Sequence, residues 1–165
     1  MFTPFHTMPE DSRIWVYQSD RPFSVDEVIK IKELMLPFIE NWTAHNQQLA
    51  AGYEIRYNRF ILIAIDEKMA LASGCSIDKS VNIIRQLEQE LNVSLMNRNL
   101  FAFKENDQVV LLPGKLFEEK IINGEIKDDT IVFNNLVDKK ANLSTDWEVP
   151  FSKSWHKQLF APLGI

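Results

Sequence analysis

Two acidic residues and the only cysteine of the chain lie close together in the sequence, on either side of a short loop. Residues 60–65 are continuously apolar, and Asp66 and Glu67 follow them directly. Cys75 comes shortly afterwards, where we expect a helix to begin. Helix N-termini stabilise anions, including thiolates, so a cysteine in this position can act as a nucleophile. This segment is therefore the first candidate for an active site.

Each of these residues also has a structural interpretation. Free cysteine is among the residues most often buried, where it packs as a small apolar side chain. This is the favoured interpretation of Cys75. One acidic pair without spaced partners is a weak ligand set, so we expect Asp66 and Glu67 to face solvent or to form a salt bridge. We predict no metal site and no cofactor. In the catalytic interpretation, Cys75 is the nucleophile and Asp66 and His156 are its companions.

Small and polar residues around the cysteine form a candidate binding loop. Ser73 and Gly74 precede the cysteine, and Ser76 is the expected N-cap of the helix. Asp78 then falls in the first turn, where the helix dipole favours an acid. We treat Ser73, Gly74, Ser76 and Asp78 as candidate binding residues.

Three further candidates lie near the C-terminus. Asn134 and Asn135 interrupt an apolar run, and buried amides must be hydrogen-bonded. The favoured interpretation is that they pin the backbone of the tail to the core; the alternative is that they orient a polar ligand. Trp155 precedes His156, a pair that a ligand pocket can use for packing and polarity.

The elements that must position these residues begin with an apolar strand at residues 13–17. A capping box, Ser24 with Glu27, starts a helix that we expect to end near residues 45–46. Two strands at 52–57 and 60–65, a second helix and a hairpin at 100–104 and 109–112 follow. The order β-α-β-β-α-β predicts an α+β protein with a ferredoxin-like split βαβ core at residues 1–112.

Residues 113–165 are expected to form a C-terminal extension of the same domain. A short helix at 115–123, a strand at 131–133, a small strand near 146–149 and a final helical turn account for most of it. The segment is rich in aromatic residues, which need burial. We predict that it packs on the sheet face that the helices leave open.

Charge and hydropathy limit the kinds of molecule that the protein is expected to bind. The net charge is −5 and the Lys and Arg residues are scattered, which argues against binding to nucleic acids or anionic membranes. No apolar run approaches the roughly 20 residues of a membrane span. Cys75 has no disulfide partner, and the first residues do not match a secretory signal. We therefore expect a cytosolic protein.

Four separated runs, at residues 12–19, 72–78, 132–137 and 154–156, carry a resemblance to a known family. Together they resemble a small uncharacterised bacterial family whose members are often labelled ABC-transporter ATPase. The resemblance spans nearly the whole chain and implies no established activity.

The residues do not support the ATPase label. Such an ATPase needs the phosphate loop Gly-x-x-x-x-Gly-Lys-Ser/Thr, whose amides and lysine hold the phosphates. The only Gly-Lys pair here is Gly114-Lys115, with Val109 at the first glycine position and Leu116 in place of the hydroxyl. ATP hydrolysis is therefore rejected.

The sequence leaves two functions open. The first is a non-catalytic binding or adaptor module that uses an aromatic-rich surface to hold a protein partner or a small polar ligand. The second is a small thiol-dependent or acid–base enzyme centred on Cys75 at a helix N-terminus. The sequence does not determine the oligomeric state.

Overall fold

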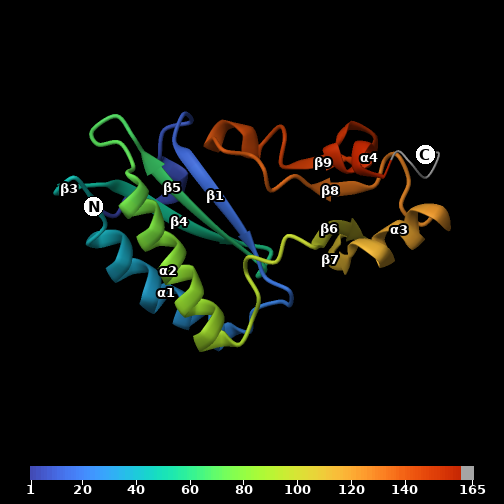
Figure 1. Cartoon of the computed structure of the whole chain (residues 1–165), viewed down its shortest axis with the longest axis horizontal. Helices are drawn as coiled ribbons and strands as arrows, with labels where there is room; N and C mark the ends of the chain where they lie inside the picture. The colour runs from blue at the N-terminus through green and yellow to red at the C-terminus, as the bar shows by residue number, and fades with distance from the viewer. Residues whose placement is uncertain (161–165) are drawn as a thin grey trace. The chain divides into compact units, whose positions relative to one another are not determined.

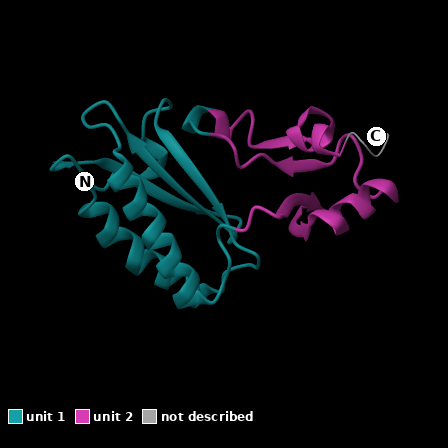
Figure 2. Ribbon diagram, in the orientation of Figure 1, with its two compact units in different colours: residues 1–96, 138–141 teal, residues 97–137, 142–165 magenta. Residues whose placement is uncertain are grey.

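The computed structural model describes residues 1–160, which fall into two compact units (Figure 2). Unit 1 comprises residues 1–96 and 138–141, and unit 2 comprises residues 97–137 and those from 142 onward. Helices and antiparallel sheets make up the chain, so the predicted α+β class is confirmed. The division falls after Met96 rather than after Leu112, so the second hairpin belongs to unit 2.

Unit 1 contains a three-stranded antiparallel sheet in the order β1-β5-β4. The strands are β1 (Arg13–Gln18), β4 (Ala50–Arg56) and β5 (Phe60–Asp66). Every residue of the central strand β5 before Asp66 is buried. This explains why its sequence is apolar throughout rather than alternating, as expected of a strand covered on both faces.

Two helices lie side by side on one face of this sheet (Figure 1). They are α1 (Val25–Glu40) and α2 (Gly74–Leu91). Their apolar faces pack with alternate residues of β5 into one core. Its fully buried members include Ile31, Met35, Ile39, Ile61, Ile63, Ile65, Ile84 and Leu87.

The predicted capping box at the start of α1 is confirmed. The Ser24 hydroxyl accepts a hydrogen bond from the Glu27 amide, and the Glu27 carboxylate accepts one from the Ser24 amide. Arg21 donates to both carboxylate oxygens of Glu27, at 2.8 and 2.7 Å, and also to the Leu91 carbonyl oxygen at 2.7 Å. The same guanidinium therefore ties the start of α1 to the end of α2.

Helix α1 ends at Glu40, earlier than predicted. The Asn41 side chain donates to the Pro37 carbonyl oxygen and satisfies the last turn. A small hairpin follows, formed by β2 (Thr43–Ala44) and β3 (Gln47–Gln48). His45 and Asn46 form its turn with positive φ values of 50° and 62°, so the chain cannot remain helical there.

The four-stranded ferredoxin-like arrangement is not confirmed. The strand expected to complete it, β6 (Leu100–Glu105), pairs with β7 and β8 instead. The place beside β1 is taken by residues 138–140: the Ile14 amide donates to the Asp138 carbonyl, and the Lys140 amide donates to the Ser12 carbonyl. A short returning segment thus occupies the edge that the fourth strand would need.

Unit 2 is built on a four-stranded antiparallel sheet in the order β7-β6-β8-β9. Its other strands are β7 (Gln108–Pro113), β8 (Ile131–Phe133) and β9 (Glu148–Pro150), and its helices are α3 (Gly114–Ile122) and α4 (Trp155–Leu159). Short 3-10 helices occur at Phe5–Thr7, Lys140–Leu143 and Phe151–Lys153. An aromatic and aliphatic core that includes Phe103, Phe117 and Phe160 joins these helices to the sheet.

Glu27→Gln should lower the free energy of unfolding by about 1 kcal/mol at pH 7, because the pair with Arg21 is partly exposed. The hydrogen bond from Arg21 lowers the pKa of Glu27 from 4.5 to about 2. The stabilisation is therefore complete above pH 4.5 and is lost as the pH falls from 4.5 toward 2. Urea unfolding at several pH values measures this, with Glu33→Gln on the same helix as the control. An equal loss at pH 7 and at pH 2.5 would contradict the assignment.

Candidate functional site

The start of α2 differs from the expected start by three residues. Ser73, not Ser76, is the N-cap: its hydroxyl accepts from the Ser76 amide at 3.1 Å. The Ser76 hydroxyl in turn forms two hydrogen bonds with the backbone of Ser73: it accepts from the amide at 2.7 Å and donates to the carbonyl at 2.8 Å. A serine replaces the usual glutamate of a capping box, which is why the sequence signal was weak. Both serines are thus used by the helix itself.

Cys75 lies in the first turn of α2, whereas the expected cap at Ser76 would place it just before the helix, and it is exposed. The favoured interpretation of a buried packing residue is therefore wrong, because burial in this turn falls to the neighbouring Ser76. The thiol makes no hydrogen bond within residues 1–160. Gly74, the first residue of α2, is exposed as well. Asp78 is also exposed, but it lies beyond the first turn of the helix, so its predicted place in the first turn is wrong.

The end of α1 is fixed to the start of α2 by a buried tryptophan. Trp42 is 1% exposed, and its indole Nε1 donates to the Ser76 carbonyl oxygen at 2.8 Å. Phe38, one turn earlier, packs on the Trp42 ring with a centroid separation of 4.9 Å. The two helices are therefore held together at this end by a hydrogen bond and a ring contact.

A groove of about 320 Å³ lies between α1 and α2 at this end. Its apolar lining residues are Phe38, Trp42 and Ile83, and its polar lining residues are Asn41, Lys79, Asn82 and Gln86. No acidic residue lines it, and Lys79 makes no ion pair within residues 1–160. We call this feature the α1–α2 groove.

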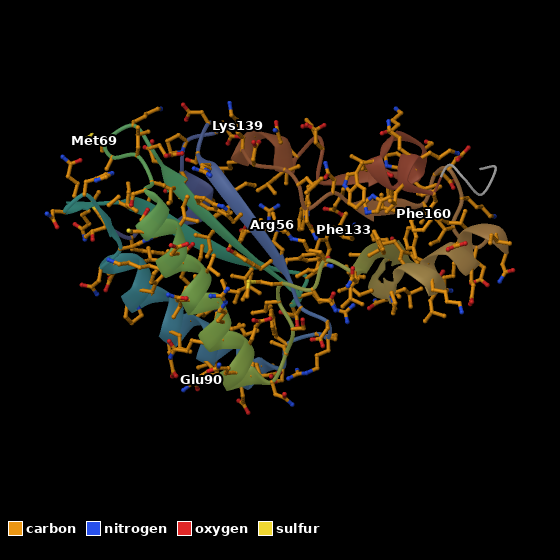
Figure 3. The ribbon with its side chains drawn as sticks, in the orientation of Figure 1. Arg56, Met69, Glu90, Phe133, Lys139 and Phe160 are labelled. Carbon is orange, nitrogen blue, oxygen red and sulfur yellow. The ribbon has the colours of Figure 1, made fainter. Side chains whose placement is uncertain are left out.

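Cys75 shares a helix face with the polar side of the groove. Residues 75, 79, 82 and 86 are spaced by four, three and four, which places their side chains along one line on α2. The loop before this helix also carries two exposed apolar side chains, Met69 at 81% and Leu71 at 68% exposure. Met69 is labelled in Figure 3. The thiol and the groove thus share one accessible surface of unit 1.

Asp66 and Glu67 have structural roles. A carboxylate oxygen of Asp66 accepts from the Lys68 amide at 3.1 Å, and one of Glu67 accepts from the Ala72 amide at 2.9 Å. The other Glu67 oxygen lies 3.9 Å from the Arg13 guanidinium. The two acids order the loop between β5 and α2, in agreement with the structural interpretation.

In unit 2, the structure brings Asn134, Asn135 and Trp155 together. The Asn134 side chain donates to the Asp146 carbonyl and accepts from the Leu136 amide and from Trp155 Nε1, the last at 3.0 Å. Asn135 Oδ1 accepts from Trp147 Nε1 at 2.9 Å. These bonds connect segments of the tail to one another, rather than pinning the tail to the core as the favoured interpretation proposed.

His156 is buried beside them, at 1% exposure. Its ring stacks on Trp155 with a centroid separation of 3.8 Å and contacts Phe101 and Phe117 at 5.7 and 6.1 Å. Among the described residues, its Nδ1 atom has no hydrogen-bond partner. Burial alone lowers the pKa of His156 to about 4, so the imidazole is neutral at pH 7.

The predicted catalytic residues are divided between the units. Cys75, Asp66 and the candidate binding residues at positions 73–78 belong to unit 1, whereas His156, Asn134, Asn135 and Trp155 belong to unit 2. The histidines of unit 1, His6 and His45, are exposed. Residues 1–160 hold no group of three or more His, Cys, Asp and Glu side chains that could bind a metal ion. Within residues 1–160, neither unit on its own therefore contains all of the predicted catalytic residues.

Sequence reasoning missed two features. The first is Lys140, whose side chain is only 11% exposed and whose ammonium donates to the His6 and Met8 carbonyls and pairs with Glu10. The groove was also missed, although Phe38, Trp42 and Ile83 are each visible as apolar residues on a predicted helix. Only the packing of the two helices brings them together.

Comparisons with known proteins add no assignment: the chain matches no family model, no curated protein and no solved structure. The resemblance described from the sequence thus stays a prediction. Within residues 1–160, none of the helices has the length and hydrophobicity that a bilayer crossing requires.

Iodoacetamide should modify Cys75 in the native protein at a rate comparable to that in the urea-unfolded chain, because the thiol is exposed. Mass spectrometry of the intact protein gives the rate, and Cys75→Ser should yield no adduct. Protection of Cys75 that persists until α2 unfolds would contradict this placement.

Proposed function

We propose that the protein is a cytosolic, non-catalytic binding module whose α1–α2 groove holds a large apolar side chain of a protein partner, next to an acidic residue of that partner. The observation that carries the proposal is the groove itself, with an apolar floor and a rim of amides and one ammonium. The cytosolic location rests on the lone cysteine, which has no disulfide partner in the chain.

The size of the groove favours a side chain over a whole cofactor. Small-molecule sites usually span about 300–1,000 Å³, so a groove of about 320 Å³ is at the lower limit of that range. One aromatic or long aliphatic side chain fills such a space. The buried anchor Trp42 holds the floor in place before binding, which reduces the entropy lost on association.

The charge of the groove favours an acidic residue in the partner, next to the apolar side chain that the groove holds. The chain carries a net charge of −5, yet the only charged residue that lines the groove is the cation Lys79. Because Lys79 has no ion pair within the described residues, a carboxylate of the partner meets an available ammonium. The exposed amides of Asn82 and Gln86 add hydrogen-bond donors beside it.

The exposed large apolar side chains differ in composition from the aromatic-rich surface expected from the sequence. Among the large apolar side chains exposed in residues 1–160, only Phe2 and Tyr57 are aromatic, and the others are aliphatic. Most aromatic rings are used in the two cores, where their large area gives the greatest stabilisation. The proposed partner therefore supplies the side chain that inserts, and this protein supplies the groove.

Selection of a phage-displayed random peptide library on the full chain tests the proposal. We expect enriched peptides with a large apolar residue beside Asp or Glu. Calorimetry with one synthetic peptide should then show that Lys79→Glu raises the Kd roughly tenfold, about 1.4 kcal/mol. Lys32→Glu, the same charge change on exposed α1 outside the groove, is the control and should have little effect. Peptides that bind wild type and Lys79→Glu equally well would contradict the proposal.

The exposed thiol favours a second candidate, a thiol-dependent enzyme in which Lys79, four residues after Cys75, stabilises the thiolate. The rate of Cys75 alkylation as a function of pH tests this alternative. The alternative would be supported if the alkylation rate of the wild type is already maximal near neutral pH and that of Lys79→Met is not. A rate still rising above pH 8 would exclude it. ATP hydrolysis is not part of either proposal, since Gly114 and Lys115 begin α3 directly after β7 with no glycine-rich loop.

A further inference from the structure

The buried histidine of unit 2 is not used by the proposed function. His156 lies on the short helix α4 and is surrounded by the rings of Phe101, Phe117 and Trp155. Phe160, at the end of the same helix, contacts Phe101 and Phe117 at 5.7 and 5.3 Å. The helix is therefore held to the sheet and to α3 mainly by aromatic contacts, and the imidazole is part of them.

No acidic group is placed to stabilise a charged imidazole. Burial is the only cause that lowers the pKa of His156, and the rings that contact it within residues 1–160 are those of Phe101, Phe117 and Trp155. The charged groups on the packed elements are paired elsewhere: Lys120 of α3 with Glu105 and Glu125, Lys157 of α4 with Asp128, and Lys104 of β6 with Glu148. The remaining charged side chains of these elements, on α3 and on the 3-10 helix before α4, are Lys115, Glu118, Glu119 and Lys153.

We propose that His156 is an acid-sensitive latch: protonation of its imidazole releases α4 and exposes the rings of Phe101 and Phe117 to solvent. In the docked state no group of residues 1–160 is bonded to the Nδ1 atom, so a proton there would be buried without a hydrogen-bond acceptor from this part of the chain. Release of α4 gives the imidazolium access to water. The docked and released states therefore differ in their affinity for one proton.

The sign and size of the effect follow from linkage. The pKa of a solvent-exposed histidine is 6.5, and that of docked His156 is about 4. The released state binds the proton more tightly, so docking is fully favoured above pH 6.5 and weakens as the pH falls from 6.5 toward 4. Between pH 7.5 and pH 5.5 the ratio of released to docked α4 should rise about tenfold.

Amide hydrogen exchange of the full chain, corrected for the intrinsic effect of pH, tests the latch. From pH 7.5 to pH 5.5, protection of residues 155–160 should fall about tenfold in wild type, whereas β6 and α2 should keep their protection. In His156→Phe the change should be absent, and in His45→Asn, which alters an exposed histidine, it should be as in wild type. Equal loss in His156→Phe, or constant protection of residues 155–160 in wild type, would overturn the proposal.

An NMR titration of wild type covers the case in which His156→Phe does not fold. The imidazole ring signals of His156 should show protonation only at pH values at which the ring-current shifts of α4 are also lost. Titration of the ring near pH 6.5 while α4 remains docked would overturn the proposal, because the docked imidazole would then be accessible to water.

Discussion

The hydrogen bond from the Trp42 indole to the Ser76 carbonyl is the constraint on which the organisation of unit 1 depends. Both groups are buried, so the loss of either one leaves a polar atom without a partner, at a cost of about 1–3 kcal/mol. The bond joins Trp42, two residues after the end of α1, to the first turn of α2. It thereby fixes the floor of the groove, the helix start that exposes Cys75 and the hairpin that continues from Trp42.

Unit 2 satisfies its polar groups differently. Two adjacent asparagines accept hydrogen bonds from two indoles and connect β8, β9 and α4 through short local contacts. The imidazole of His156, which follows one of these tryptophans, has no such partner at Nδ1. A core with one unsatisfied titratable group is stable while that group is neutral, which is the physical basis of the latch proposed for α4.

Local signals in the sequence were sufficient to predict the individual elements. The capping box of Ser24 and Glu27, the apolar run of β5 and the hairpin of β6 and β7 each depend on a few neighbouring residues, and each is confirmed. The sheet in which β6 takes part was not predictable in this way. It depends on residues 138–140, which return to β1 from a distant part of the chain.

The candidate site was predictable only in part, for the same reason. Local sequence indicated that a helix begins near Cys75, but the residue at which it begins was missed by three positions, and the exposure of the thiol depends on which face of α2 is turned toward the sheet. The groove combines residues 38–42 with residues 79–86, and no local pattern encodes their antiparallel register. The exposure of aliphatic rather than aromatic residues is likewise a result of tertiary packing.

The most direct test of the account is an NMR titration of the 15N-labelled full chain with a peptide that carries a large apolar residue beside a carboxylate. As peptide is added, the indole N–H signal of Trp42 and the side-chain amide signals of Asn82 and Gln86 should shift along the same saturating binding curve. The indole signal of Trp147, which is bonded to Asn135, should remain unchanged. Saturable shifts at Trp147 with a constant Trp42 signal would contradict the claim that the α1–α2 groove is the binding surface.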